Sequence, residues 1–285
     1  NNGKWWFSDS RFKRKAGKKD DSIRRFGKKV PFICQWFEAE NSWKYYYEDE
    51  SEYIKHSDIN SIIQVGSILY FGTMYGILFL DEFTREWGLI DGSKLYDNAV
   101  WDIVSYKNSL FVATSNGINE ISIINNMVIP DNKGVFKVFR NSNIFDLESN
   151  SNYLYIASDL GLFQIDWQDY NVTALSNKLI RRIHLNDFDL TASDGSLWIY
   201  KDNQEKFLAS KIQNYDICES FIWNTNYQNY VTLTDTISSK SWIYNQEDGI
   251  LGNKIFDVNC DSDWVWFLTN KGISFFNWSR YHKIN

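Results

Sequence analysis

The sequence predicts an all-β fold, a single β-propeller of about seven four-stranded blades. A short apolar strand pattern recurs along the 285 residues at intervals close to 40 residues. Aromatic residues make up 18% of the chain, and their side chains favour pleated, half-buried strands over helices. Helical periodicity is nearly absent. Four short strands in each unit of this length are typical of a propeller blade.

Each unit opens with an apolar residue, two variable residues and a second apolar residue. The pattern occurs at 23–26, 59–62, 100–103, 144–147, 180–183 and 255–258, and in a weaker form, with Asn214 in the first place, at 214–217. Its third residues are Arg25, Ser61, Asp102, Asp146, Arg182, Asp216 and Asp257, so the successive steps are 36, 41, 44, 36, 34 and 41 residues. We therefore expect an N-terminal strand and basic arm over 1–22 and the propeller over 23–285.

Four of the units continue in the same way after the opening strand. Each has a hydrophobic strand, a hydroxyl residue, two loop residues and a glycine, as in Thr73-Met74-Tyr75-Gly76. The glycine predicts a hairpin turn that needs a positive φ, which residues with a side chain adopt only at a cost. The fifth unit is degenerate, the sixth has no turn glycine, and the first is irregular around 32–37.

The repeated motif resembles that of the two-component regulator propellers. In that family an apolar strand ends in Trp-aromatic-Gly-Thr and is followed by two residues and Gly-Leu or Gly-Ile. The stretches 69–77 and 265–273 are similar to it, and the likeness extends over about 58–166 and 248–278. It is faint over 179–246. Membership would imply a periplasmic or extracellular propeller that acts as a sensing or protein-binding module.

Charge is distributed unevenly along the chain. Ten Lys or Arg and two Asp between Arg11 and Lys29 give a local charge of +8. The net charge of the chain is −6, so the remaining residues carry −14. An acidic body repels nucleic acid, and we expect no nucleic-acid partner. The basic arm is a solvated loop or a contact for an anionic surface. No apolar run approaches the 18 residues that a transmembrane helix needs.

The third position of the opening strand is the strongest candidate for a binding site. First strands line the central channel of a propeller, so these side chains are expected to lie near one another. The candidate ligand-binding residues are Asp102, Asp146, Asp216, Asp257, Arg25 and Arg182. The carboxylates could bind Ca²⁺ or a cationic group. Alternatively, each Asp bonds locally to its own or the next blade, as a repeated structural device would.

Signals for catalysis are sparse. His56, His184 and His282 are scattered, and no zinc-binding or phosphate-binding motif occurs. The sequence therefore favours a non-enzymatic module that binds a protein partner or a small polar ligand, alone or as a subunit of a larger extracytoplasmic assembly. A polysaccharide hydrolase or lyase is the alternative, because acids are abundant. Exposed aromatic residues near 5–6 and 45–47 could contact a partner or pack between blades.

Two further expectations concern the cysteines and the chain ends. Cys218 lies two residues past Asp216 and Cys260 three past Asp257, so strand alternation turns them to opposite faces. We expect these thiols and Cys34 to be free. The segment 4–8 is apolar enough to form a strand. We expect it either to complete the last blade beside 274–277, so that the two chain ends close the propeller, or to be the remaining strand of a blade lost upstream.

Overall fold

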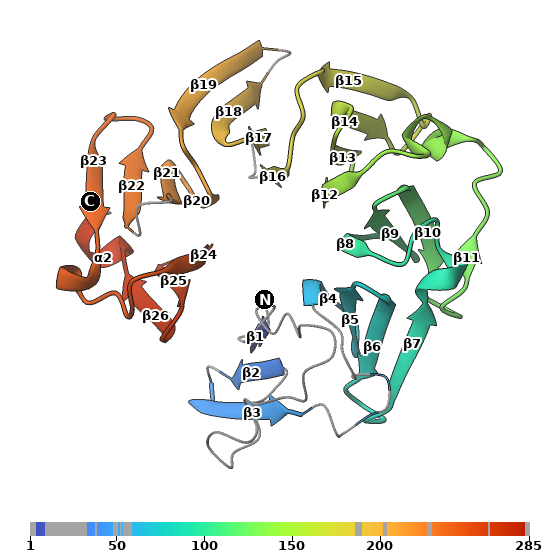
Figure 1. Ribbon diagram of the computed structural model, residues 1–285, viewed down its shortest axis with the longest axis horizontal. Helices are drawn as coiled ribbons and strands as arrows, with labels where there is room; N and C mark the ends of the chain where they lie inside the picture. Colours follow the sequence, from blue (N-terminus) through green and yellow to red (C-terminus); the bar gives the residue numbers. More distant parts are fainter. Residues whose placement is uncertain are drawn as a thin grey trace, which may run out of the picture. The chain divides into compact units, whose positions relative to one another are not determined.

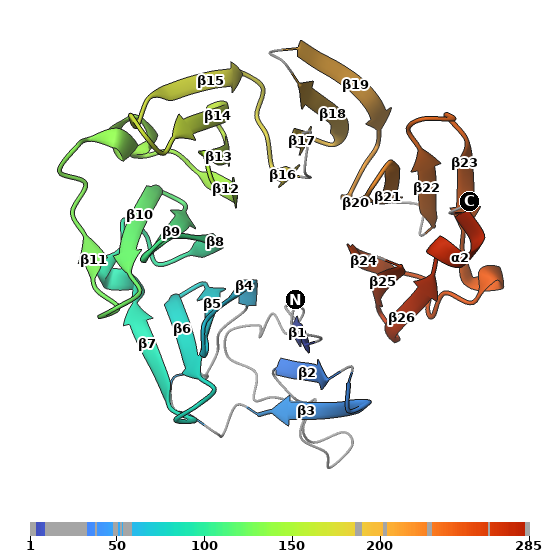
Figure 2. The same cartoon turned by 180° about the vertical axis from the view of Figure 1, so that it is seen from behind.

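The computed structural model describes residues 4–8, 33–37, 39–47, 51, 53, 59–185, 190–201, 204–226, 230–261 and 263–282. These residues form an all-β fold of the β-propeller type, with almost no helix (Figure 1). The chain divides into two compact units, Asn1–Leu179 and Ile180–Asn285. In every sheet the strands follow one another in sequence order and pair antiparallel, as Figure 2 shows from the opposite side.

Unit 1 contains one three-stranded and three four-stranded sheets. The first sheet is β1 (Lys4–Ser8), β2 (Ile33–Phe37) and β3 (Ser42–Tyr46). The second is β4 (Ile59–Val65), β5 (Ile68–Thr73), β6 (Gly76–Asp81) and β7 (Trp87–Asp91). The third is β8 (Val100–Tyr106), β9 (Ser109–Thr114), β10 (Gly117–Ser122) and β11 (Val128–Ile129). The fourth is β12 (Ile144–Ser149), β13 (Tyr153–Ser158), β14 (Gly161–Asp166) and β15 (Val172–Ser176).

Unit 2 contains two four-stranded sheets and one three-stranded sheet, followed by a short helix. The first sheet is β16 (Arg182–Leu185), β17 (Leu190–Ser193), β18 (Ser196–Lys201) and β19 (Gln204–Ser210). The second is β20 (Asn214–Cys218), β21 (Phe221–Thr225), β22 (Val231–Asp235) and β23 (Ser241–Tyr244). The last is β24 (Ile255–Asp261), β25 (Trp264–Thr269) and β26 (Gly272–Asn277), and α2 (Ser279–His282) follows it.

The structure explains why a hydroxyl residue and a glycine recur in the second hairpin of the blades. The Thr73 hydroxyl donates to the carbonyl of Gly76 at 2.9 Å and accepts from the Tyr75 amide at 3.1 Å. Gly76 has φ +116°, and a Cβ there would lie 2.3 Å from the carbonyl oxygen of Ile90. The same hydroxyl-to-glycine bond recurs at 114–117, 158–161 and 269–272. The predicted turn is confirmed at these four positions.

The third position of the opening strand follows a β-bulge in four sheets. The pairing register shifts immediately before Ser61, Asp102, Asp146 and Asp257. A bulge bends its strand and changes the direction of a side chain, which accounts for the constant spacing at these positions. The residue opposite is Gly72, Ala113 or Ala157 in the first three, so little bulk faces the bulged strand there.

The core lies between successive sheets rather than within any one of them. In unit 1, Ile156 and Leu154 of β13 pack with Phe111 and Ala113 of the preceding sheet. In unit 2, Trp223 of β21 packs with side chains of the next sheet, among them Val258 and Phe267. Within each unit, these neighbouring sheets therefore pack face against face. This arrangement determines which residues meet across sheets.

Two expectations about the blades are wrong. The described residues do not form seven four-stranded blades, because β1–β3 and β24–β26 have three strands each. The expected first opening strand at 23–26 lies outside the described residues. The segment Lys4–Ser8 does form a strand, β1, as expected. However, β1 pairs with β2 and not with β26. Trp6 packs against Tyr46 and Phe71, with ring centroids 5.7 and 6.3 Å away, so this strand contributes to the core of unit 1.

The first sheet separates its aromatic residues between two faces, as alternation predicts. Tyr46 is 3% exposed and donates a hydrogen bond to the buried side chain of Gln35. Tyr45 is 45% exposed and stacks on Trp43. One of the adjacent tyrosines therefore points away from the core, as expected. Across the described part of the chain, no helix has the length and apolar character needed to cross a membrane.

Candidate functional site

The predicted site residues lie on the first strands of their sheets, and the structure gathers them into three groups. Asp102 and Asp146 meet in unit 1. Arg182 pairs with Asp257 in unit 2, and Asp216 pairs with His184 beside them. Arg25 lies outside the described residues. Two of the carboxyl groups thus face each other, and the other two face basic side chains.

Asp102 and Asp146 form a carboxyl pair between neighbouring strands of unit 1. Asp102 accepts a hydrogen bond from the Leu147 amide at 2.9 Å, which links β8 to β12. Burial, and then the charge and hydrogen bond of Asp146, raise the pKa of Asp102 well above its usual range. A glycoside hydrolase keeps its two carboxyl groups roughly 5–10 Å apart so that the scissile bond fits between them. Two hydrogen-bonded carboxyl groups leave no such space, and this pair matches the local structural alternative.

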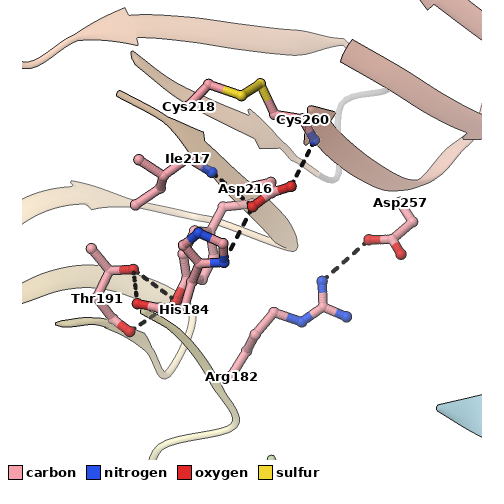
Figure 3. A network of polar contacts seen from close by, with 9 residues as sticks. Arg182, His184, Thr191, Asp216, Ile217, Cys218, Asp257 and Cys260 are labelled. Atoms are coloured by element: carbon pink, nitrogen blue, oxygen red, sulfur yellow. Dashed lines mark hydrogen bonds and ion pairs between the residues drawn. A yellow bond between two sulfur atoms is a disulfide. The ribbon is translucent and has the colours of Figure 1, made fainter. Parts of the chain in front are cut away.

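Arg182 and Asp257 form an accessible ion pair on the first strands of unit 2. The Arg182 Nη1 atom lies 3.2 Å from the Asp257 Oδ1 atom, as Figure 3 shows. Both side chains are close to half exposed, at 41% and 47%. An exposed pair of this kind contributes only about 0–1 kcal/mol, because water screens it and two long side chains must be ordered. The pair therefore opens at little cost and presents both charges to solvent.

Asp216 is the buried member of the same region. Its Oδ1 atom lies 3.2 Å from Nδ1 of His184, and it accepts from the amides of Ile217 at 2.8 Å and Cys260 at 2.6 Å (Figure 3). Burial raises the pKa of Asp216, while the neighbouring His184 and the two amide bonds oppose that rise. The amide of Cys260 belongs to the next sheet, so Asp216 joins β20 to β24.

His184 was missed as a site residue although the sequence contained a signal for it. Side chains two residues apart on a strand point to the same face, so Arg182 on β16 predicts that His184 shares its face. The Thr191 hydroxyl donates to the His184 carbonyl at 3.1 Å, and Tyr215 donates to the Thr191 carbonyl at 3.1 Å. These bonds fix the backbone that carries His184 against β20.

The expected equivalence of Asp216 with the other acidic positions is wrong. In unit 2, the buried residues at the start of the sixth unit are Ile212 and Tyr215, which take the two apolar places of the pattern. The amide of Gln213 bonds to the carbonyl of Thr225, and Asn214 pairs with the same residue. Asn214 therefore occupies the third position, and Asp216 lies two residues beyond it. Its burial and its different partners follow from that shift.

The expectation of three free thiols is also wrong. Cys218 and Cys260 form a disulfide, with their Cα atoms 5.9 Å apart, and Cys34 is the free cysteine of the described residues. Tyr215 packs toward the preceding sheet, whereas Cys218 packs toward β24–β26. Neighbouring sheets pack face against face, so the face of one sheet that is directed toward the next sheet contacts the opposite face of that next sheet. Cys218 and Cys260 point to opposite faces of their own sheets, and for this reason they meet between the two sheets.

Calcium binding by the acidic positions stays a prediction. Within the residues that the structure describes, no group of three or more His, Cys, Asp or Glu side chains is arranged to hold a metal ion. The carboxylates of Asp102 and Asp146 face each other, and that of Asp257 faces Arg182. A hard cation would have to be held by these pairs together with ligands from elsewhere.

Comparisons with known proteins show the fold. The chain is similar to the extracellular domain of the hybrid two-component system candidate BT3049 from B. thetaiotaomicron, at 17% identity and TM-score 0.65, over 86% of this chain and 38% of that one. It is similar to PorZ, a surface component of the type-IX secretion system of Porphyromonas gingivalis, at 14% identity and TM-score 0.60, over 85% and 34%.

A third similar structure is the extracellular domain of the one-component system candidate BT4673 from B. thetaiotaomicron, at 15% identity and TM-score 0.60, over 77% of this chain and 33% of that one. This chain thus spans about a third of the length of each of these proteins. No family model and no curated protein sequence matches it. The resemblance to propellers of bacterial regulators is supported at the level of fold, and the specific repeat family is not confirmed.

Proposed function

We propose that this chain is a non-enzymatic, extracytoplasmic binding module that holds a small zwitterionic ligand at Arg182 and Asp257. The observation that carries the proposal is the exposed ion pair between these residues, which lie on the first strands of the first and last sheets of unit 2. A ligand with both a carboxylate and an ammonium group can replace each half of the pair. The contact between the two side chains is then replaced by a contact of each side chain with the ligand.

The surroundings of the pair support this proposal. Asp216 and His184 lie beside it, and Asp216 is fixed by two backbone amides. The disulfide between Cys218 and Cys260 holds the two strands that carry Asp216 and Asp257 together. Disulfides persist outside the cytoplasm, and the similar structures include extracellular domains and a surface component. Both points support an extracytoplasmic location.

The proposal is tested by calorimetric titration with glycylglycine at low ionic strength. We expect saturable binding that is lost when Arg182→Gln or Asp257→Asn is introduced. The Arg181→Gln variant is the matched control, because it removes a neighbouring positive charge on the same segment and should bind normally. The double exchange Arg182→Asp with Asp257→Arg should retain binding, since a zwitterion can reverse its direction. Unchanged affinity in Arg182→Gln would refute the proposed site.

A protein partner is the second candidate, and the hairpin tips of unit 1 favour it. Phe83, between β6 and β7, is 88% exposed, and Ile124, between β10 and β11, is 81% exposed. These are equivalent hairpins of neighbouring sheets, and exposed apolar side chains that gather into a patch mark contact surfaces. A Phe83→Ser and Ile124→Ser double variant should lose a partner that cross-links to the wild-type protein. Retention of the partner by that variant would contradict this role.

A further inference from the structure

A cavity in unit 2 lies beside the C-terminal helix and is separate from the proposed zwitterion site. Its volume is about 520 Å³. It is bounded by the β20–β21 turn, the β22–β23 hairpin and α2, and Figure 1 shows α2 next to β23. Cavities of this size hold small organic ligands. The site residues discussed above do not line it.

Aromatic side chains form much of the cavity wall. Trp242 of β23, Phe221 of β21, and Tyr281 and His282 of α2 all line it. The His282 ring lies 4.6 Å from Trp242 in an edge-to-face arrangement. Phe276 stacks on Tyr281 at 5.2 Å, and the Tyr281 ring is nevertheless 62% exposed. Rings held by other rings present fixed π surfaces to the cavity.

His282 contributes a ring without a positive charge at neutral pH. Burial lowers the pKa of His282 below its usual value of 6.5. Its Nε2 atom lies 2.5 Å from the hydroxyl oxygen of Tyr244, which fixes the orientation of the imidazole. Among the lining residues, the ionised side chains are therefore those of Glu219, Asp235 and Lys240, with a formal sum of −1.

Hydrogen bonds stabilise the ionised form of the Asp235 side chain. The Ser238 hydroxyl and the amides of Ile237 and Ser238 donate to its carboxylate. These hydrogen bonds, that of the Ser238 side chain first, lower the pKa of Asp235, so the group stays ionised at any physiological pH. Glu219 lies on the opposite turn, between β20 and β21. Two acids thus border the aromatic wall, one from the β20–β21 turn and one from the end of β22.

We propose that this cavity binds an organic ammonium cation of the tetramethylammonium or choline type. Aromatic faces attract such cations through the ring quadrupole, and the net negative lining adds to that attraction. An anionic ligand would be repelled by the same lining. A neutral apolar ligand would gain nothing from Glu219 and Asp235. The combination of rings and acids therefore selects for a soft, bulky positive charge.

The test is a fluorescence and calorimetric titration of the full chain with tetramethylammonium chloride and with choline chloride, against sodium chloride at equal ionic strength. We expect saturable binding of both cations that sodium does not reproduce. The neutral isostere of choline, 3,3-dimethylbutanol, should bind at least about tenfold more weakly, because it lacks the charge. Equal binding of the isostere would overturn the proposal, as would the absence of saturable cation binding.

Substitutions in the lining test whether the cations bind in this cavity. Trp242→Ala should weaken cation binding by about tenfold or more, whereas Trp264→Ala removes an exposed tryptophan of β25 and should leave it unchanged. Glu219→Gln should lower the affinity several-fold, and Lys240→Gln should raise it. An anionic ligand would show the reverse, with a higher affinity for Glu219→Gln and a lower affinity for Lys240→Gln. If Trp242→Ala keeps the wild-type melting temperature and the wild-type affinity, the site is elsewhere and the proposal fails.

Discussion

Removal of the disulfide between Cys218 and Cys260 should destabilise unit 2 strongly. The cross-link joins residues 42 positions apart on the first strands of neighbouring sheets. For a closed loop of this length, the chain-entropy relation gives about 4 kcal/mol of stabilisation at 25 °C. The link also holds β20 and β24 where the Asp216 carboxylate meets the Cys260 amide. We therefore expect Cys218→Ser with Cys260→Ser to lower the free energy of unfolding by about 4 kcal/mol.

The measurement is guanidinium unfolding of the wild type and the double variant, with and without reductant. Reductant should destabilise the wild type and leave the double variant unchanged. Cys34→Ser is the matched control, because Cys34 is not in a disulfide, and its response to reductant should equal that of the wild type. Thiol titration of the denatured, unreduced protein should find one free thiol. Three free thiols, or a reductant-insensitive wild type, would refute the reasoning.

Three further predictions follow from the inner strands and the hairpin turns. The folded pKa of Asp102 lies above its unfolded value near 3.8, so the stability that it contributes is complete below that pH and is lost as the pH rises through the folded pKa. Asp102→Asn should therefore raise the melting temperature at pH 7, and the gain should vanish near pH 4; a gain that persists at pH 4 would contradict this sign. Gly76→Ala should cost about 3 kcal/mol in denaturant unfolding, because its Cβ meets a carbonyl at 2.3 Å, whereas Gly195→Ala has open space and should cost about 1 kcal/mol. Millimolar Ca²⁺ should raise the melting temperature if the acidic positions bind it, and the shift should shrink in Asp146→Asn; no shift in either protein would favour purely local bonding.

The regular blades were predictable because their signals are local. Thr73 and Gly76 lie three residues apart, and the hydrogen bond that they form closes one turn. The alternation that buries Tyr46 and exposes Tyr45 also needs only neighbouring residues. The sixth unit was misplaced by two residues because Asn214-Tyr215-Asp216-Ile217 keeps an Asp in the third place, although its first residue is polar. The stretch that starts at Ile212 fits the pattern better, and the burial of Ile212 and Tyr215 identifies it as the start.

The sequence by itself determined the all-β class, the blade repeats, the hairpin turns and the acidic residues on the first strands. Tertiary structure decided which of those residues meet. The partners of Asp102 and Asp216 include amides of the next sheet, more than 40 residues away, and Arg182 reaches Asp257 75 residues along the chain. The disulfide depends on the same face-against-face packing of sheets. Contacts of this kind are set by how faces pack in space, and strand alternation within one segment carries no information about that packing.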